Sequence, residues 1–279
     1  MIYDLVIVPL TYNFYLQATL VCILIGIVCP LLGAFVINRE LGFMGDAMAH
    51  SVLPGMIIAF SIGINPFIGA IPNAIFIALL IGFLVRRFKI STDTSIGIIF
   101  SFLFSIGLVI MSIIGGTKIN LEEILIGQVL SISNVDVIIT SILSVIVISI
   151  TLIFYRPLVY IGFDYYGATV SGIPSQKLDY LLLILLSIVI VVSLQLVGII
   201  LVIGLLITPS AAASLLVKRF KNVIILGIII GITSSVLGLY ISFHSDLPSG
   251  PTICIVSTVI FCISLLKKFI FSRKYFIQL

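Results

Sequence analysis

The chain of 279 residues is 61% hydrophobic and 9% charged, with a mean hydropathy of +1.41. A soluble domain carries about 25% charged residues, so this composition excludes a water-soluble fold and indicates lipid as the solvent. The formal net charge of +4 does not indicate a nucleic-acid partner, because the basic residues lie in short clusters between apolar stretches.

A helix needs about 20 predominantly apolar residues to cross a membrane. Hydropathy along the chain predicts nine such spans, and therefore an all-α, polytopic membrane helix bundle in a single transmembrane domain over 1–279. The apolar stretch 178–217 is too long for one crossing and is divided near Gln195 to Gly198. The predicted spans are 14–37, 46–64, 66–85, 94–114, 135–155, 178–195, 197–217, 222–243 and 250–267.

Two segments lie outside these spans, namely Met1 to Asn13, which is expected at the membrane interface, and 115–134. Met1 to Gln17 contains no Lys or Arg, so it lacks the basic start of a cleaved signal peptide and the first span is expected to remain. The segment 115–134 contains Lys118, Glu122 and Glu123 and is predicted to be an external loop with a short amphipathic helix.

The distribution of Lys and Arg predicts the orientation, because cytoplasmic loops carry an excess of these residues. Under the nine-span layout only Lys118 lies on one side, and the other thirteen of the 14 basic residues lie on the opposite side. The N-terminus is therefore expected outside and the C-terminus in the cytoplasm.

The run GDAMAHSVLPG, residues 45–55, places Asp46 and His50 four residues apart in an apolar setting. On a helix such residues share one face, with Cβ atoms about 5–6 Å apart. Ionisable groups at membrane depth are costly and usually functional, and carboxylate with imidazole suits Mn²⁺, Fe²⁺ or Zn²⁺. Two ligands make an incomplete site, which a second copy of the chain could double. The alternatives are a structural Asp–His pair or Asp46 as a helix N-cap.

The connection 156–177 gathers aromatic residues, including Tyr160, Phe163, Tyr165 and Tyr166, ahead of Gly172 and Pro174. A short helix with exposed aromatics can dock in a partner's groove. It can equally lie at the membrane interface, with its tyrosines at the level of the headgroups. The pattern alone leaves both interpretations open.

His244 and Asp246 lie in a loop expected on the outside. They could contact an incoming ion or a docking protein, although a solvated turn explains them as well. The chain has no G-x-x-x-x-G-K-[ST] phosphate loop, and its cytoplasmic segments are too short for a nucleotidase domain. Any ATP-driven work would need another polypeptide, so the chain is not expected to be an enzyme.

Over essentially its whole length the chain resembles the permease subunits of bacterial ATP-binding-cassette importers for manganese, zinc and iron. The most specific part of the resemblance is GDAMAHSVLPG at 45–55. Three further stretches support it, namely TPSAAA at 208–213, DLPSGPTI at 246–253, and FYRPL at 154–158 followed by Phe163-Asp164. Family members often carry Ser before the His and Ala after it. Here Ala49 and Ser51 take those places, which leaves both candidate ligands intact.

The resemblance implies a multi-pass permease of the bacterial cell membrane that works by alternating access, with Asp46 and His50 as metal ligands on the translocation path. It implies a homodimer of permease chains, cytoplasmic subunits that bind ATP, and an extracytoplasmic metal-binding lipoprotein. The stretch GFMGDAM at 42–48 is closer to manganese permeases, with zinc and iron as alternatives. The residues implied to form the ATPase-coupling loop are Phe163, Asp164, Tyr165, Tyr166, Gly167, Ser171 and Gly172.

Two rival functions remain at this stage. The first is a gradient-driven secondary metal transporter or channel, which needs a coupling-ion site and no partner. The second is a membrane scaffold in which Asp46 and His50 are structural. Co-purification of a nucleotide-binding subunit would separate the importer from both.

Overall fold

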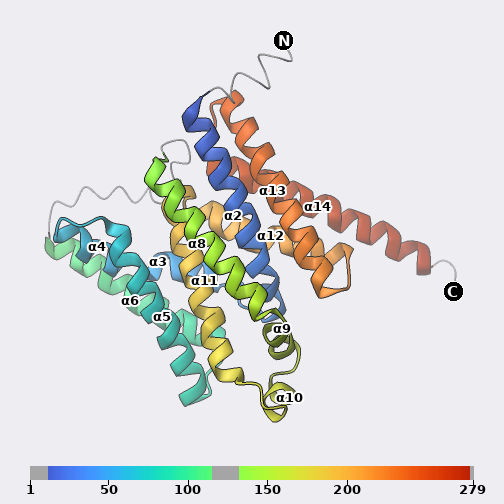
Figure 1. Cartoon of the computed structure of the whole chain (residues 1–279), viewed down its shortest axis with the longest axis horizontal. Helices are drawn as coiled ribbons and strands as arrows, with labels where there is room; N and C mark the ends of the chain where they lie inside the picture. Colours follow the sequence, from blue (N-terminus) through green and yellow to red (C-terminus); the bar gives the residue numbers. More distant parts are fainter. Residues whose placement is uncertain (1–11, 115–131, 277–279) are drawn as a thin grey trace. The chain divides into compact units, whose positions relative to one another are not determined.

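The computed structural model describes residues 12–114 and 132–276, and all regular secondary structure in these ranges is helical. Eight of the described helices are long and apolar enough to cross a membrane (Figure 1). They are α2 (Asn13–Asn38), α5 (Pro66–Phe88), α6 (Thr92–Ile114), α8 (Asn134–Ile153), α11 (Ser175–Val197), α12 (Ile199–Leu216), α13 (Phe220–Ser245) and α14 (Ser249–Phe276). The predicted all-α membrane fold is confirmed. Most of the predicted external loop at 115–134 lies outside the described residues.

The predicted division of 178–217 is also confirmed. The helix α11 ends at Val197 and α12 begins at Ile199, with Gly198 between them at a φ of 83°. A side chain is rarely tolerated at such a positive φ, whereas glycine adopts it readily. The long apolar stretch is therefore interrupted at its glycine.

The predicted span at 46–64 is divided in the structure. Two shorter helices, α3 (Met44–Ser51) and α4 (Leu53–Ser61), occupy this segment and are separated at Val52. Pro54 supplies the physical reason, because it has no N–H to donate to the carbonyl of His50 four residues earlier. Asn73 of α5 donates a side-chain hydrogen bond of 3.2 Å to the Ser51 carbonyl at this break.

The chain divides into two compact units, which are described separately. Unit 1 comprises Met1–Ile37, Leu125–Ile146 and Leu196–Leu279, and unit 2 comprises Asn38–Ile124 and Val147–Gln195. The expectation that 1–279 acts as a single domain stays a prediction.

Unit 1 is built by close contacts between α2 and helices α12 and α13. A Cβ atom at Gly33 would overlap the backbone carbonyl of Leu206, and one at Gly231 would overlap the carbonyl of Gly26. Ser210 donates a hydrogen bond of 2.8 Å to the Pro30 carbonyl inside α2. The hydrophobic effect does not drive helices together in lipid. Close backbone packing at small residues and hydrogen bonds from hydroxyl groups therefore hold these helices together.

Unit 2 packs α4 against α5 and α6, and α3 against α6. Small residues again permit these contacts, since a Cβ atom at Gly55 would meet Asn73 and the Gly69 backbone, and one at Gly107 would meet Leu53 and Pro54. The broken segment α3–α4 is therefore held on both sides by long helices of its own unit, which positions Asp46 and His50.

One end of unit 2 is held by ion pairs from Asp179 of α11 to Arg39 and Arg86. Arg39 precedes α3 and Arg86 lies in the last turn of α5, so the chain between them leaves this end and returns to it. Because α5 provides one passage, α3 and α4 together provide the other. This supports a broken passage at 44–61, while the total of nine crossings and the orientation of the termini stay predictions.

Candidate functional site

Asp46 and His50 lie on the same face of α3, as their spacing predicts. The distance from His50 Nε2 to Asp46 Oδ1 is 3.5 Å. Nitrogen and oxygen ligands lie about 2.0–2.2 Å from a bound transition metal, so two of them on one ion are separated by about 3.0–3.5 Å. The two atoms are therefore spaced as ligands of one shared ion would be.

The alternative role of Asp46 as a helix N-cap does not fit the structure. Phe43 occupies the N-cap position of α3 and no side chain caps the helix, whereas Asp46 lies within the first turn. The Asp46 side chain is 41% exposed and that of His50 is 26% exposed, so an arriving ion could reach both. Met44 and Met48, which lie nearby in sequence, are fully buried and act as packing residues.

Aromatic rings of α6 support the His50 imidazole. The centroid of the His50 ring lies 5.9 Å from that of Phe100 and 5.5 Å from that of Phe104. The two phenylalanines stack on each other at 5.7 Å, and Phe43 meets Phe100 edge-on. These residues were not singled out from the sequence, although Phe100 and Phe104 are spaced to share one face of a helix.

Within the part of the chain that the structure describes, no group of three or more His, Cys, Asp or Glu side chains could hold a metal ion. The site in one chain is therefore a pair. A pair binds a divalent ion less tightly than a full set of four ligands, because fewer donor atoms replace the ion's water shell.

The coupling-loop residues implied by the resemblance run from the last residue of α9 (Tyr155–Phe163) through α10 (Tyr165–Val170) to the two residues that follow it, all within unit 2. Asp164 caps α10 by accepting a hydrogen bond of 2.8 Å from the Gly167 backbone N–H. Gly172, at a φ of 81°, ends the segment, and the Ser171 hydroxyl bonds back to the Gly167 carbonyl.

The surface of this helix pair is apolar and accessible. Phe163 is 66% exposed, Tyr166 82% and Val170 89%, while Tyr165 contacts Tyr166 edge-on. The segment is a compact, capped element with an apolar face, suited to a groove in a partner.

His244 and Asp246 are both exposed at the end of α13 in unit 1. The His244 ring packs on Tyr240 with 4.3 Å between centroids, and its Nδ1 lies 3.0 Å from the Tyr240 carbonyl. Asp246 adopts a left-handed conformation as the C-cap residue. These contacts shape a helix end, and a role in binding an ion or a protein stays a prediction.

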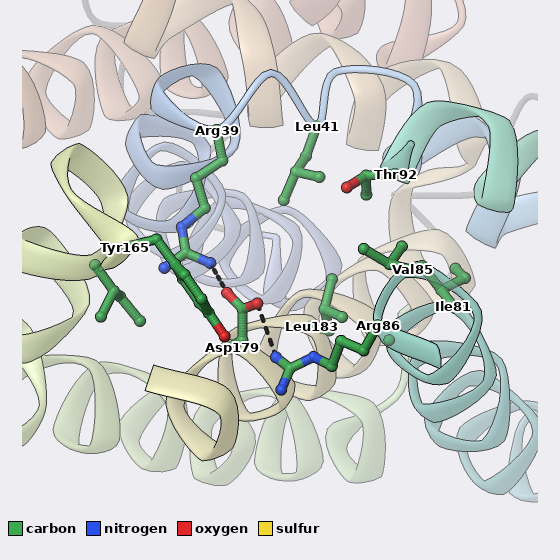
Figure 2. Close-up of a pocket in the computed structure, with 11 residues that line it drawn as sticks. Arg39, Leu41, Ile81, Val85, Arg86, Thr92, Tyr165, Asp179 and Leu183 are labelled. Atoms are coloured by element: carbon green, nitrogen blue, oxygen red, sulfur yellow. Dashed lines mark hydrogen bonds and ion pairs between the residues drawn. The ribbon is translucent and has the colours of Figure 1, made fainter. Parts of the chain in front are cut away.

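A second polar cluster of unit 2 was missed from the sequence. Asp179 joins Arg39 and Arg86 beside a cavity (Figure 2). From the sequence, Arg39 and Arg86 are simply two of the thirteen basic residues that predict the cytoplasmic side. No local pattern links them to Asp179, since the pairs are 140 and 93 residues apart.

Comparisons with known proteins cover nearly the whole chain. The family model described as the ABC 3 transport family matches residues 11–268. The manganese transport system membrane protein MntC of Halalkalibacterium halodurans is 40% identical over 265 residues, which are 95% of this chain and 89% of that protein. The chelated iron transport system membrane protein YfeD of Yersinia pestis is 36% identical over 270 residues, which are 97% of this chain and 91% of that protein.

A solved structure agrees with these relatives. PsaBC from Streptococcus pneumoniae in complex with Fab matches with a TM-score of 0.82 and 34% identity, and the match covers 95% of both chains. The similarity therefore extends over the whole helix bundle and is not confined to the run at 45–55.

Proposed function

This chain belongs to the ABC 3 transport family and is a multi-pass membrane permease of an ATP-binding-cassette metal importer, and from that premise we propose that it takes up manganese. The main structural support for metal transport is the Asp46–His50 pair, in which His50 Nε2 lies 3.5 Å from Asp46 Oδ1. Relatives named for manganese transport, such as MntC, favour this metal, whereas YfeD is named for chelated iron. Carboxylate and imidazole by themselves suit either ion.

In the proposed mechanism, a delivery protein releases the ion on the outside and two copies of the permease each contribute Asp46 and His50. Four ligands from two chains replace part of the ion's water shell, and the imidazole must be neutral to bind. The aromatic rings of Phe100 and Phe104 keep the His50 ring oriented. The rings thereby reduce the reorganisation that binding requires.

Release requires that the two halves of the site separate or rotate. We infer that ATP binding and hydrolysis on separate cytoplasmic subunits act through α9 and α10, whose apolar face is exposed. Since α3 and these helices belong to the same compact unit, a displacement of the loop can be transmitted to the ligands by packed helices. Selectivity would rest largely with the delivery protein.

Metal accumulation in cells tests this proposal. Cells that lack the chain are complemented with the intact chain, Asp46→Ala or His50→Ala, and Mn, Zn and Fe are quantified together. Both variants are expected to accumulate no more manganese than cells without the chain. Asp93→Ala removes an exposed carboxylate in the first turn of α6; it is the matched control and should restore uptake.

Two outcomes contradict separate parts of the proposal. Normal uptake in Asp46→Ala or His50→Ala, at normal expression, would remove that residue from the ligand set. If zinc or iron alone falls in cells without the chain, the manganese assignment is wrong while the ligand assignment stands.

A further inference from the structure

A cavity of about 260 Å³ lies at the end of unit 2 where several helices begin or end. Arg39 follows α2, Arg86 lies in the last turn of α5, and Thr92 begins α6. Asp179 comes from the start of α11 and Tyr165 from α10, with its ring reaching toward Asp179 (Figure 2). Basic residues Arg87 and Lys89 follow directly after Arg86, so this end corresponds to the predicted cytoplasmic side.

The charges that line this cavity do not balance. One Asp179 oxygen accepts from Arg39 Nη1 and the other accepts from Arg86 Nη2 at 2.8 Å. The cavity lining holds two guanidinium groups and one carboxylate, which leaves one positive charge over. Two other nearby acids, Glu40 and Asp93, are exposed and do not line the cavity.

Hydrogen-bond donors of the two arginines are also left over. Arg39 Nε, Arg39 Nη2 and Arg86 Nη1 are buried and have no hydrogen-bond partner among the described residues. The arginine side chains are only 14% and 16% exposed. Buried polar groups are nearly always satisfied, so unpaired donors beside a cavity require an explanation. These three donor atoms are shielded from solvent, and the Arg86 guanidinium lies 4.3 Å over the Tyr180 ring. An anion in the cavity would therefore accept from them after a shift of the guanidinium groups.

We propose that this cavity binds the phosphate group of an acidic membrane lipid. Guanidinium groups present paired donors that match phosphate oxygens, and the Thr92 and Tyr165 hydroxyls in the lining could add further bonds. Apolar residues complete the wall, namely Leu41, Ile81, Val85, Ile161 and Leu183.

The membrane position favours a lipid over free phosphate. The cavity lies at the ends of apolar, membrane-length helices, and the cytoplasmic leaflet is rich in anionic lipids. Free phosphate would leave the apolar wall unused, whereas a lipid would place its glycerol and first methylene groups against it. Because the lining residues Ile161 and Tyr165 come from α9 and α10, a bound lipid would also restrain these two helices against the end of α5.

Lipid binding to the purified full-length chain, with any subunits that accompany it, tests the proposal. The protein is stripped of lipid in a neutral detergent and titrated with phosphatidylglycerol, phosphatidylcholine or inorganic phosphate. Melting temperature and the lipid retained in native mass spectrometry are the readouts. Phosphatidylglycerol is expected to be retained and to raise the melting temperature, while phosphatidylcholine has little effect.

Variants assign the binding to the cavity. Arg39→Gln and Arg86→Gln are expected to weaken phosphatidylglycerol binding about tenfold or more, since each removes charge-assisted bonds. Arg87→Gln, an exposed neighbour with the same charge, is the matched control and should bind as the unmodified chain does. Asp179→Asn keeps both arginines and removes the competing carboxylate, so it should bind more tightly.

Equal binding by the unmodified chain, Arg39→Gln and Arg86→Gln would overturn the proposal. If either arginine variant fails to fold, the Asp179→Asn variant is the test. If Asp179→Asn binds phosphatidylglycerol no more tightly than the unmodified chain does, the proposed binding site is wrong. If inorganic phosphate raises the melting temperature saturably and phosphatidylglycerol does not, the ligand is free phosphate and the lipid proposal is wrong. None of these measurements uses the transported metal, so their outcome is separate from that of the uptake experiment.

Discussion

At the scale of single residues, His50 depends on its neighbours as much as on Asp46. Its ring lies within 6 Å, centroid to centroid, of two α6 phenylalanines, at 5.9 and 5.5 Å. Groups that orient a metal ligand reduce the freedom the ligand must lose on binding, and their removal commonly weakens metal binding about 10- to 100-fold. An apolar contact that holds an imidazole edge-on has the same orienting effect as a hydrogen bond, but is weaker.

We therefore expect Phe104→Leu to raise the KM for metal uptake up to about tenfold, near the lower end of that range. The leucine keeps the site apolar but removes the ring that packs edge-on against His50. Phe102→Leu is the matched control, because Phe102 lies on the same helix and is 62% exposed. Uptake kinetics over a range of metal concentrations check this, and an unchanged KM in Phe104→Leu would mean that the ring does not orient His50.

At the scale of helices, both units are assembled through glycines at points of backbone contact. Gly33 on α2 faces the carbonyl of Leu206 on α12, and Gly26 faces Gly231 on α13. These contacts allow Ser210 to reach the Pro30 carbonyl. A methyl group at such a point has no flexible side chain to displace, so the backbones themselves must separate.

Gly33→Ala is expected to destabilise the protein by about 1–3 kcal/mol, the usual cost of overpacking a close contact. Gly97→Ala on α6 is the control, because a Cβ atom there meets nothing within 4 Å in this chain. Thermal unfolding of the two purified variants in the same detergent compares them. Equal melting temperatures would show that α2 and α12 can move apart at no cost.

At the scale of the whole molecule, the metal-ligand pair, the coupling helices and the cationic cavity all belong to unit 2. One compact unit thus contains both the proposed ion site and the proposed site of ATPase contact. The outer-loop candidates His244 and Asp246 belong to unit 1.

Tyr166→Ser tests the coupling surface. Tyr166 is 82% exposed, so its loss should leave the melting temperature of the isolated permease unchanged, while retention of the ATPase subunit during purification and metal uptake should both fall severalfold. Leu247→Ser is the control, because Leu247 is 51% exposed and follows α13 in unit 1. Full retention of the ATPase subunit in Tyr166→Ser would place the contact elsewhere.

The sequence by itself determined the membrane class, the division at Gly198 and the Asp46–His50 pair, because each depends on residues close together in the chain. Hydropathy and helical periodicity are local properties, and they describe most span boundaries to within three residues. Hydropathy alone does not show that the span at 46–64 consists of two helices, because apolar composition continues through Pro54 although the regular hydrogen bonding of the helix does not.

Tertiary structure alone decided the rest. The Phe100 and Phe104 rings reach His50 from another helix, and Asp179 meets arginines 140 and 93 residues away in the chain. Charge pairs of this kind have no periodic signature, because any acidic residue at the start of α11 would look the same in the sequence. Their unpaired donors and the cavity beside them exist only once packing brings α5, α10 and α11 together.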